Sequence, residues 1–132
     1  MLRSITPQDK NAVCLFTAHV FCSYEPMCKA LGATVPIWVQ QFDPLIDACC
    51  SSGMSFMMES AGHDPNTIMS VSLALPYAQY LSVELEENPM FDPIIQLLDS
   101  LPDLPDTDAS SQAVALNLVW GTHHSHMNKG YL

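Results

Sequence analysis

The apolar residues of this chain change their spacing along the sequence, and this change constrains the fold more than any other feature. Between residues 6 and 52 they recur every three or four positions, the spacing that places side chains on one face of a helix. Between residues 54 and 75, and again between 110 and 121, they alternate with polar residues, as is typical of strands. Both element types must therefore share one core.

The first part of the sequence predicts a short strand and a long helix. The strand covers residues 2–6, where the alternation is short. The helix begins at Thr6 or Pro7, because proline suits the first helical turn. It ends near Ser23, because Pro26 disfavours helical backbone at the residue before it. Its predicted apolar stripe consists of Val13, Phe16, Val20 and Phe21.

Two glycines and a proline divide the next stretch. A short helical turn after Glu25 is closed by Gly32, a suitable C-terminal cap. A second amphipathic helix spans residues 36–52, and we expect Pro44 to kink it or split it in two. Gly53 ends it. The apolar face of this helix is predicted to contain Trp38, Phe42, Leu45, Ile46 and Cys49.

The second half of the sequence predicts a hairpin, a helix and a last strand. Residues 54–60 and 67–75 are separated by the turn sequence GHDPN, so the two segments are expected to pair as antiparallel strands. Residues 89–101 have helical spacing, and residues 110–121 form the last strand. A loop rich in His, with a glycine near its end, follows that strand.

The length and composition allow one compact domain, residues 1–132, because the 132 residues are 48% hydrophobic. The predicted order is strand, helix, helix, strand, strand, helix, strand. A mixed layer of helices on a sheet accommodates this order. The predicted fold class is therefore α+β, with a mixed, mostly antiparallel sheet flanked by helices.

The charge of the chain excludes some partners and favours others. Four Lys/Arg stand against fourteen Asp/Glu, giving a formal net charge of −10. This argues against nucleic acid and anionic membrane surfaces as partners, and it favours a cationic one such as an amine. Eight of the acids lie in residues 84–108, a run that predicts a solvated face.

The cysteines and the first residues indicate a cytoplasmic protein. The first ten residues contain no apolar signal core, and no stretch is long enough for a spanning helix. The five cysteines are an odd number and show no C-x-x-C spacing, so we expect reduced, buried thiols and neither a disulfide framework nor a structural zinc site. The adjacent Cys49 and Cys50 are expected to pack in the core.

The loop after the last strand holds two candidate sites. Lys129 and Gly130 could present backbone N–H groups to phosphate, or they could form a plain turn. His123, His124 and His126 could bind a metal, but no Cys or carboxylate lies close by in sequence, and an exposed polar loop is the alternative.

The stretch GTHHSHMNKGYL resembles the acetyl-CoA-binding loop of the GNAT N-acetyltransferases. In that family, the amides of an Arg/Gln-x-x-Gly-x-Gly/Ala loop hold the cofactor pyrophosphate. In register, Met127 takes the Arg/Gln position, Gly130 the first glycine and Leu132 the last small residue. The acetyl-CoA-binding residues that the resemblance implies are Leu118, Val119, Trp120, Thr122, Met127, Asn128, Lys129 and Gly130.

A second segment is similar to the Glu-Pro-Leu segment of the arylalkylamine-type branch of that family. Here Phe21 is followed by Glu25-Pro26 and then by Leu31-Gly32. The resemblance implies that Glu25 is the catalytic general base, acting through water on the amine. A partly buried carboxylate with a raised pKa would suit this role. The alternative is that Glu25 caps the short helix that begins at Pro26.

The resemblance implies acetyl transfer from acetyl-CoA to a small-molecule primary amine. The amine would attack the thioester, and backbone N–H groups of a splayed strand pair around residues 118–121 would hold the thioester carbonyl. The match covers the amino-terminal half of a GNAT domain. We therefore expect an incomplete domain, and the family's donors of a proton to the leaving thiolate lie in the part without a counterpart here.

A non-catalytic function is the alternative. A sheet that ends at the strand 112–121 would expose an edge, and such edges recruit partner strands. The chain would then be a protein-interaction module that forms a homodimer or is completed by another polypeptide.

Overall fold

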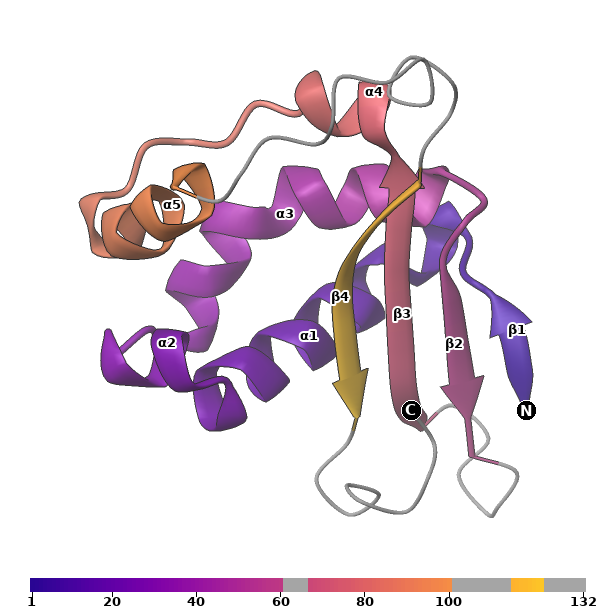
Figure 1. Ribbon diagram of the computed structural model, residues 1–132. Helices are drawn as coiled ribbons and strands as arrows, with labels where there is room; N and C mark the ends of the chain where they lie inside the picture. The colour runs from indigo at the N-terminus through magenta and orange to yellow at the C-terminus, as the bar shows by residue number, and fades with distance from the viewer. Residues whose placement is uncertain (61–66, 101–114, 123–132) are drawn as a thin grey trace.

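The computed structural model describes residues 1–60, 67–100 and 115–122, and it has an antiparallel sheet with helices on one face (Figure 1). The strands are β1 (Leu2–Ser4), β2 (Phe56–Glu59), β3 (Ile68–Pro76) and β4 (Ala115–Thr122). Their order in the sheet is β1-β2-β3-β4, and each neighbouring pair is antiparallel. The α+β class and the hairpin of β2 and β3 are therefore confirmed.

The helices lie in two parts of the chain. Those before β2 include α1 and α3, which pass behind the strands in Figure 1. Of those between β3 and β4, α4 lies beyond the end of β3 and α5 lies to the left of the sheet in the same view. The helical segments are η1 (Pro7–Asp9), α1 (Lys10–Tyr24), α2 (Pro26–Ala30), α3 (Val35–Ser51), α4 (Tyr77–Leu81), η2 (Pro89–Phe91) and α5 (Asp92–Asp99).

The ends of the first helices follow the local sequence. α1 ends before Glu25, which has extended backbone with ψ of 121°, as a residue before proline favours. Gly32 and Gly53 follow α2 and α3 with φ of 70° and 74°, a conformation that glycine adopts without a steric penalty. Pro44 lies inside α3, which stays one helix and bends along its length (Figure 1). The predicted kink is thus present, and the predicted split is not.

The core lies between the sheet and the helices α1 and α3. Val71, Leu73 and Leu75 of β3 are buried in it. Ile68 joins them although its spacing from Val71 is odd, because the β2–β3 register shifts and leaves Met69 as an extra residue of β3. Other members of this cluster are Val13, Cys14 and Ala18 of α1, Trp38, Ile46 and Cys49 of α3, and Met57 of β2.

A row of aromatic rings extends the core away from the sheet. Trp38 contacts Phe21 and Phe42, with ring centroids 5.4 and 4.8 Å apart. Phe42 in turn meets Phe91 edge to face at 5.1 Å. Phe91 is 0% exposed, so it anchors η2 and the start of α5 on α3.

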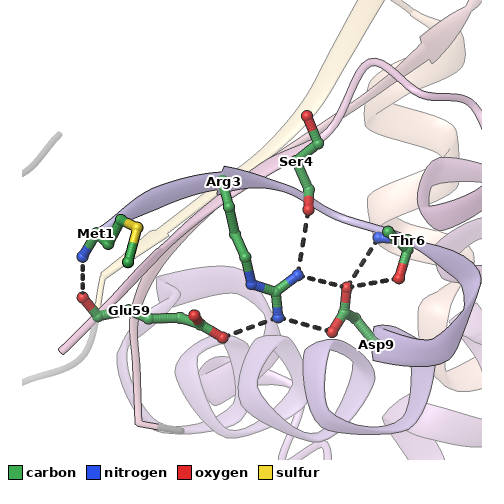
Figure 2. A network of polar contacts seen from close by, with 6 residues as sticks. All are labelled: Met1, Arg3, Ser4, Thr6, Asp9 and Glu59. Atoms are coloured by element: carbon green, nitrogen blue, oxygen red, sulfur yellow. Dashed lines mark hydrogen bonds and ion pairs between the residues drawn. The ribbon is translucent and has the colours of Figure 1, made fainter. Parts of the chain in front are cut away.

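An ionic network ties the N-terminal strand to its neighbours. Figure 2 shows the Arg3 guanidinium between the carboxylates of Asp9 and Glu59. Arg3 donates two hydrogen bonds of 2.8 Å to Asp9 and one of 2.8 Å to Glu59. Asp9 also accepts from the backbone N–H of Thr6 at 2.8 Å, and the Met1 amino group donates to the Glu59 carbonyl. β1, η1 and β2 are thereby held together.

Candidate functional site

Glu25 lies at the junction of α1 and α2 and caps the second of these helices. Its two carboxylate oxygens accept the backbone N–H groups of Met27 at 3.1 Å and Cys28 at 2.7 Å. Pro26 occupies the first helical position, where no N–H is needed. The capping interpretation of this residue is therefore confirmed.

The pKa of Glu25 is lowered from its ordinary value. Burial acts to raise the pKa, but the N–H groups of Cys28 and Met27 stabilise the carboxylate and outweigh it. The raised pKa expected from the sequence is wrong, because the same geometry that half-buries Glu25 also supplies hydrogen-bond donors. Glu25 is a carboxylate at neutral pH and a weaker base than a raised pKa would make it.

β4 contains a bulge at the position expected to hold the thioester. Val119 pairs with Leu73 and Asn117 pairs with Ala74, so Leu118 is an extra residue in β4. The extra residue of a bulge is left out of the ladder, and its backbone is turned away from the regular pattern. Trp120 and Thr122 pair in register with Ser72 and Ser70.

Several candidate residues lie outside the described residues. These are Met127, Asn128, Lys129 and Gly130 of the predicted phosphate loop, and His123, His124 and His126 of the predicted metal site. Among residues 1–60, 67–100 and 115–122, the described contacts do not join Glu25 to β4. In Figure 1 the α1–α2 junction lies to the left of the sheet, on the side where β4 is the last strand.

The cysteines are structural. All five are free thiols, and all but the half-buried Cys22 are buried. Burial raises the pKa of Cys49 to about 11 and of Cys50 to about 12, so neither is an activated nucleophile. The part of the chain with described positions contains no group of three or more His, Cys, Asp or Glu suited to a metal ion. None of its helices is both long enough and apolar enough to cross a membrane.

A hollow of about 380 Å³ lies between α3 and the segment that leads into α5. The sequence did not predict it. Gln41 of α3 is 2% exposed and lines the hollow, and its Nε2 has no hydrogen-bond partner in the described part of the chain. The other lining residues are Leu85, Glu86, Glu87, Asn88, Pro89, Asp92 and Ile95.

No family model matches the chain, and no curated protein is significantly similar to it.

Proposed function

We propose that this chain is a GNAT-like N-acetyltransferase domain that transfers an acetyl group from acetyl-CoA to a primary amine. The order of elements supports this. A short strand, helices, two paired strands, further helices and a last strand follow one another, and the strands lie side by side in chain order as an antiparallel sheet. This is the arrangement that the resemblance of the sequence to the amino-terminal half of a GNAT domain implies.

The bulge at Leu118 is the observation that carries the proposal. It lies within the segment 118–121, where the resemblance requires backbone N–H groups that are free to hold a thioester carbonyl. Because β4 is the end strand of the described sheet, the N–H groups of a regular β4 would point alternately toward β3 and away from it, and the bulge interrupts this alternation at Leu118. A bulge next to the predicted cofactor loop gives the strand a donor that a developing oxyanion can use.

The reaction follows from these parts. The amine nitrogen attacks the thioester carbon, and the carbonyl oxygen gains negative charge near the bulge. The C–S bond then breaks, and the coenzyme leaves as a thiolate. The proton lost by the amine passes to water held by Glu25. The lowered pKa of Glu25 makes the carboxylate better suited to orient the ammonium group and this water than to keep the proton.

The charge of the chain favours binding of the amine more than binding of acetyl-CoA. A net charge of −10 attracts an ammonium group and repels the phosphates of acetyl-CoA. Binding of acetyl-CoA should therefore strengthen as salt screens the repulsion.

Calorimetric titration of acetyl-CoA into the chain, after circular dichroism shows it folded, tests the proposal. We expect micromolar binding that Gly130→Glu weakens at least tenfold and that the exposed Glu84→Gln leaves unchanged. Release of free thiol in the presence of a panel of primary amines then measures the transfer. A folded chain that neither binds acetyl-CoA nor releases thiol would contradict the proposal.

A second function is favoured by the position of β4. β4 ends the strand order of the described sheet, and within that sheet it is hydrogen-bonded to β3 alone. Such an edge can pair with the same edge of a second copy. Sedimentation of the chain over a hundredfold concentration range tests this. A dimer that Asn117→Pro abolishes would support it, and a monomer at all concentrations would contradict it.

A further inference from the structure

We propose that the hollow between α3 and residues 85–95 binds a small organic cation that also carries a hydrogen-bond acceptor. The inference goes beyond acetyl transfer, because it concerns binding alone and is tested without acetyl-CoA. It rests on three features of the hollow: its charge, a buried amide without a partner, and its apolar walls.

The charge of the hollow is negative, and no basic side chain among the described residues that line it balances this charge. Glu86, Glu87 and Asp92 all line it, and no Lys or Arg does. The whole sequence has only four basic side chains. Two of them are paired elsewhere, Arg3 with Asp9 and Glu59, and Lys10 with Asp43 and Asp47. Three carboxylates around one concave surface repel one another, and a bound cation relieves that repulsion.

Gln41 adds an observation that is independent of the acidic residues. Its side chain is 2% exposed, lines the hollow, and leaves Nε2 without a partner in the described residues. A buried amide N–H that lacks an acceptor costs free energy. A ligand oxygen in the hollow could accept this hydrogen bond. The ligand is therefore expected to combine a positive charge with an acceptor, and a bare ammonium ion satisfies only half of the site.

The walls and the size of the hollow favour an organic ligand. Leu85, Pro89 and Ile95 supply apolar surface to the lining of the hollow. About 380 Å³ accommodates a molecule of several carbon atoms. In the described part of the chain, these acids do not form a group suited to a metal ion. An alkyl chain with an ammonium group at one end and an oxygen at the other matches this lining.

The residues around the hollow are held in place by contacts of their own. Phe91 is buried against Phe42, which fixes the start of α5 on α3. Asn88 caps η2 by accepting the N–H of Met90 at 3.1 Å. Gln40 donates to Glu86 at 3.3 Å and so links the acidic segment to α3. The site is therefore largely preformed, which reduces the cost of ordering on binding.

The first experiment compares three probes by two-dimensional NMR of the full chain. 5-Amino-1-pentanol carries both groups, pentylamine lacks the oxygen, and 5-hydroxypentanoate reverses the charge. We expect the amino alcohol to bind with a Kd below about 1 mM and to shift the amide signals of residues 85–95. Pentylamine should bind at least threefold more weakly, and the anion should not bind. Equal binding of the anion, or no binding of the amino alcohol, would overturn the inference.

Variants separate the two halves of the site. Gln41→Met removes the N–H donor at nearly constant size, and we expect the affinity for the amino alcohol to fall to that for pentylamine. The double variant Glu87→Gln, Asp92→Asn should weaken both amines at least fivefold. Glu84→Gln is the matched control, because Glu84 is exposed on the same segment and does not line the hollow. An equal loss in the control, or no loss in the double variant, would show that the site is not the one proposed.

Discussion

Phe42 and Phe91 meet edge to face with ring centroids 5.1 Å apart, and this contact joins α3 to the start of α5. Phe91 follows a segment in which exposed acids are frequent, yet it is 0% exposed. One aromatic side chain therefore fixes on the core the acidic segment whose Glu86 and Glu87 line the hollow.

Truncation of Phe91 should loosen this anchor. We expect Phe91→Ala to lower the free energy of unfolding by about 3–5 kcal/mol, because a fully buried ring is replaced by a cavity. Phe91→Leu should cost about 1.5 kcal/mol or less if the site repacks, and it serves as the variant that still folds. Urea unfolding followed by tryptophan fluorescence measures both. Near-wild-type stability of the alanine variant would contradict the role given to Phe91.

The aromatic anchor illustrates what the sequence can and cannot predict. The bounds of α1, α2 and α3, the hairpin and the glycines that end α2 and α3 were predictable, because spacing and turn residues are local properties, whereas α4 was not predicted. The face of α1 was predictable only in part: of the predicted stripe Val13 is fully buried, but Phe16, Val20 and Phe21 are half-buried, and Thr17, which was not predicted, is fully buried. Thr17 satisfies its hydroxyl by donating to the Val13 carbonyl at 2.8 Å, so the polar residue fits the close approach of the helix.

The hollow shows a second limit of what can be predicted from the sequence. Gln41 is polar, and the spacing of the apolar residues gave no reason to place it inside the protein. Gln41 lines the hollow together with a segment some fifty residues later in the chain, which the Phe42–Phe91 contact joins to α3. Ser70 of β3 is likewise only 3% exposed, and it lies between Met58 of β2 and Thr122 of β4. The burial of Gln41 and of Ser70 therefore depends on contacts between segments that are distant in the sequence.

Replacement of Gln41 should stabilise the chain. Gln41→Met removes a buried amide N–H that has no partner in the described residues and keeps a similar shape. We expect the free energy of unfolding to rise by about 1 kcal/mol, since an unsatisfied buried donor is costly. Thermal unfolding of the ligand-free chain checks this. A lower melting temperature would mean that Nε2 has an acceptor within the folded chain.

The Arg3 network should make stability depend on acid pH. Arg3 holds the pKa of Asp9 well below its ordinary value, and it lowers the pKa of Glu59 as well. Because both folded-state pKa values are depressed, their stabilisation is fully present above the ordinary carboxyl pKa of about 4 and is lost as the pH falls through the folded values.

Arg3→Met tests this dependence. Arg3 is partly exposed, so the cost at pH 7 should be about 1 kcal/mol in the free energy of unfolding. The difference from the wild-type chain should shrink steadily as the pH is lowered below about 4. Arg3→Lys should recover part of the loss but not the paired geometry. A difference that stays constant between pH 7 and pH 3 would argue against the network as its source.

Glu25 offers a test that separates capping from catalysis. Glu25→Ala removes the acceptor for the N–H groups of Met27 and Cys28 and should cost about 1 kcal/mol of stability. Glu25→Asn keeps a capping oxygen without the charge, so it should recover most of that stability. If Glu25 orients the amine, transfer activity should fall at least tenfold in both Glu25→Ala and Glu25→Asn. The free energy of unfolding should fall clearly only in Glu25→Ala.

The pH profile of the transfer completes the test. Because the pKa of Glu25 is lowered, its carboxylate is already ionised across neutral pH, and it should contribute no ionisation step between about pH 5 and pH 8. Any rise in rate over that range should persist in Glu25→Asn. A step that disappears in this variant would mean that Glu25 titrates near neutrality and acts as the proton acceptor after all.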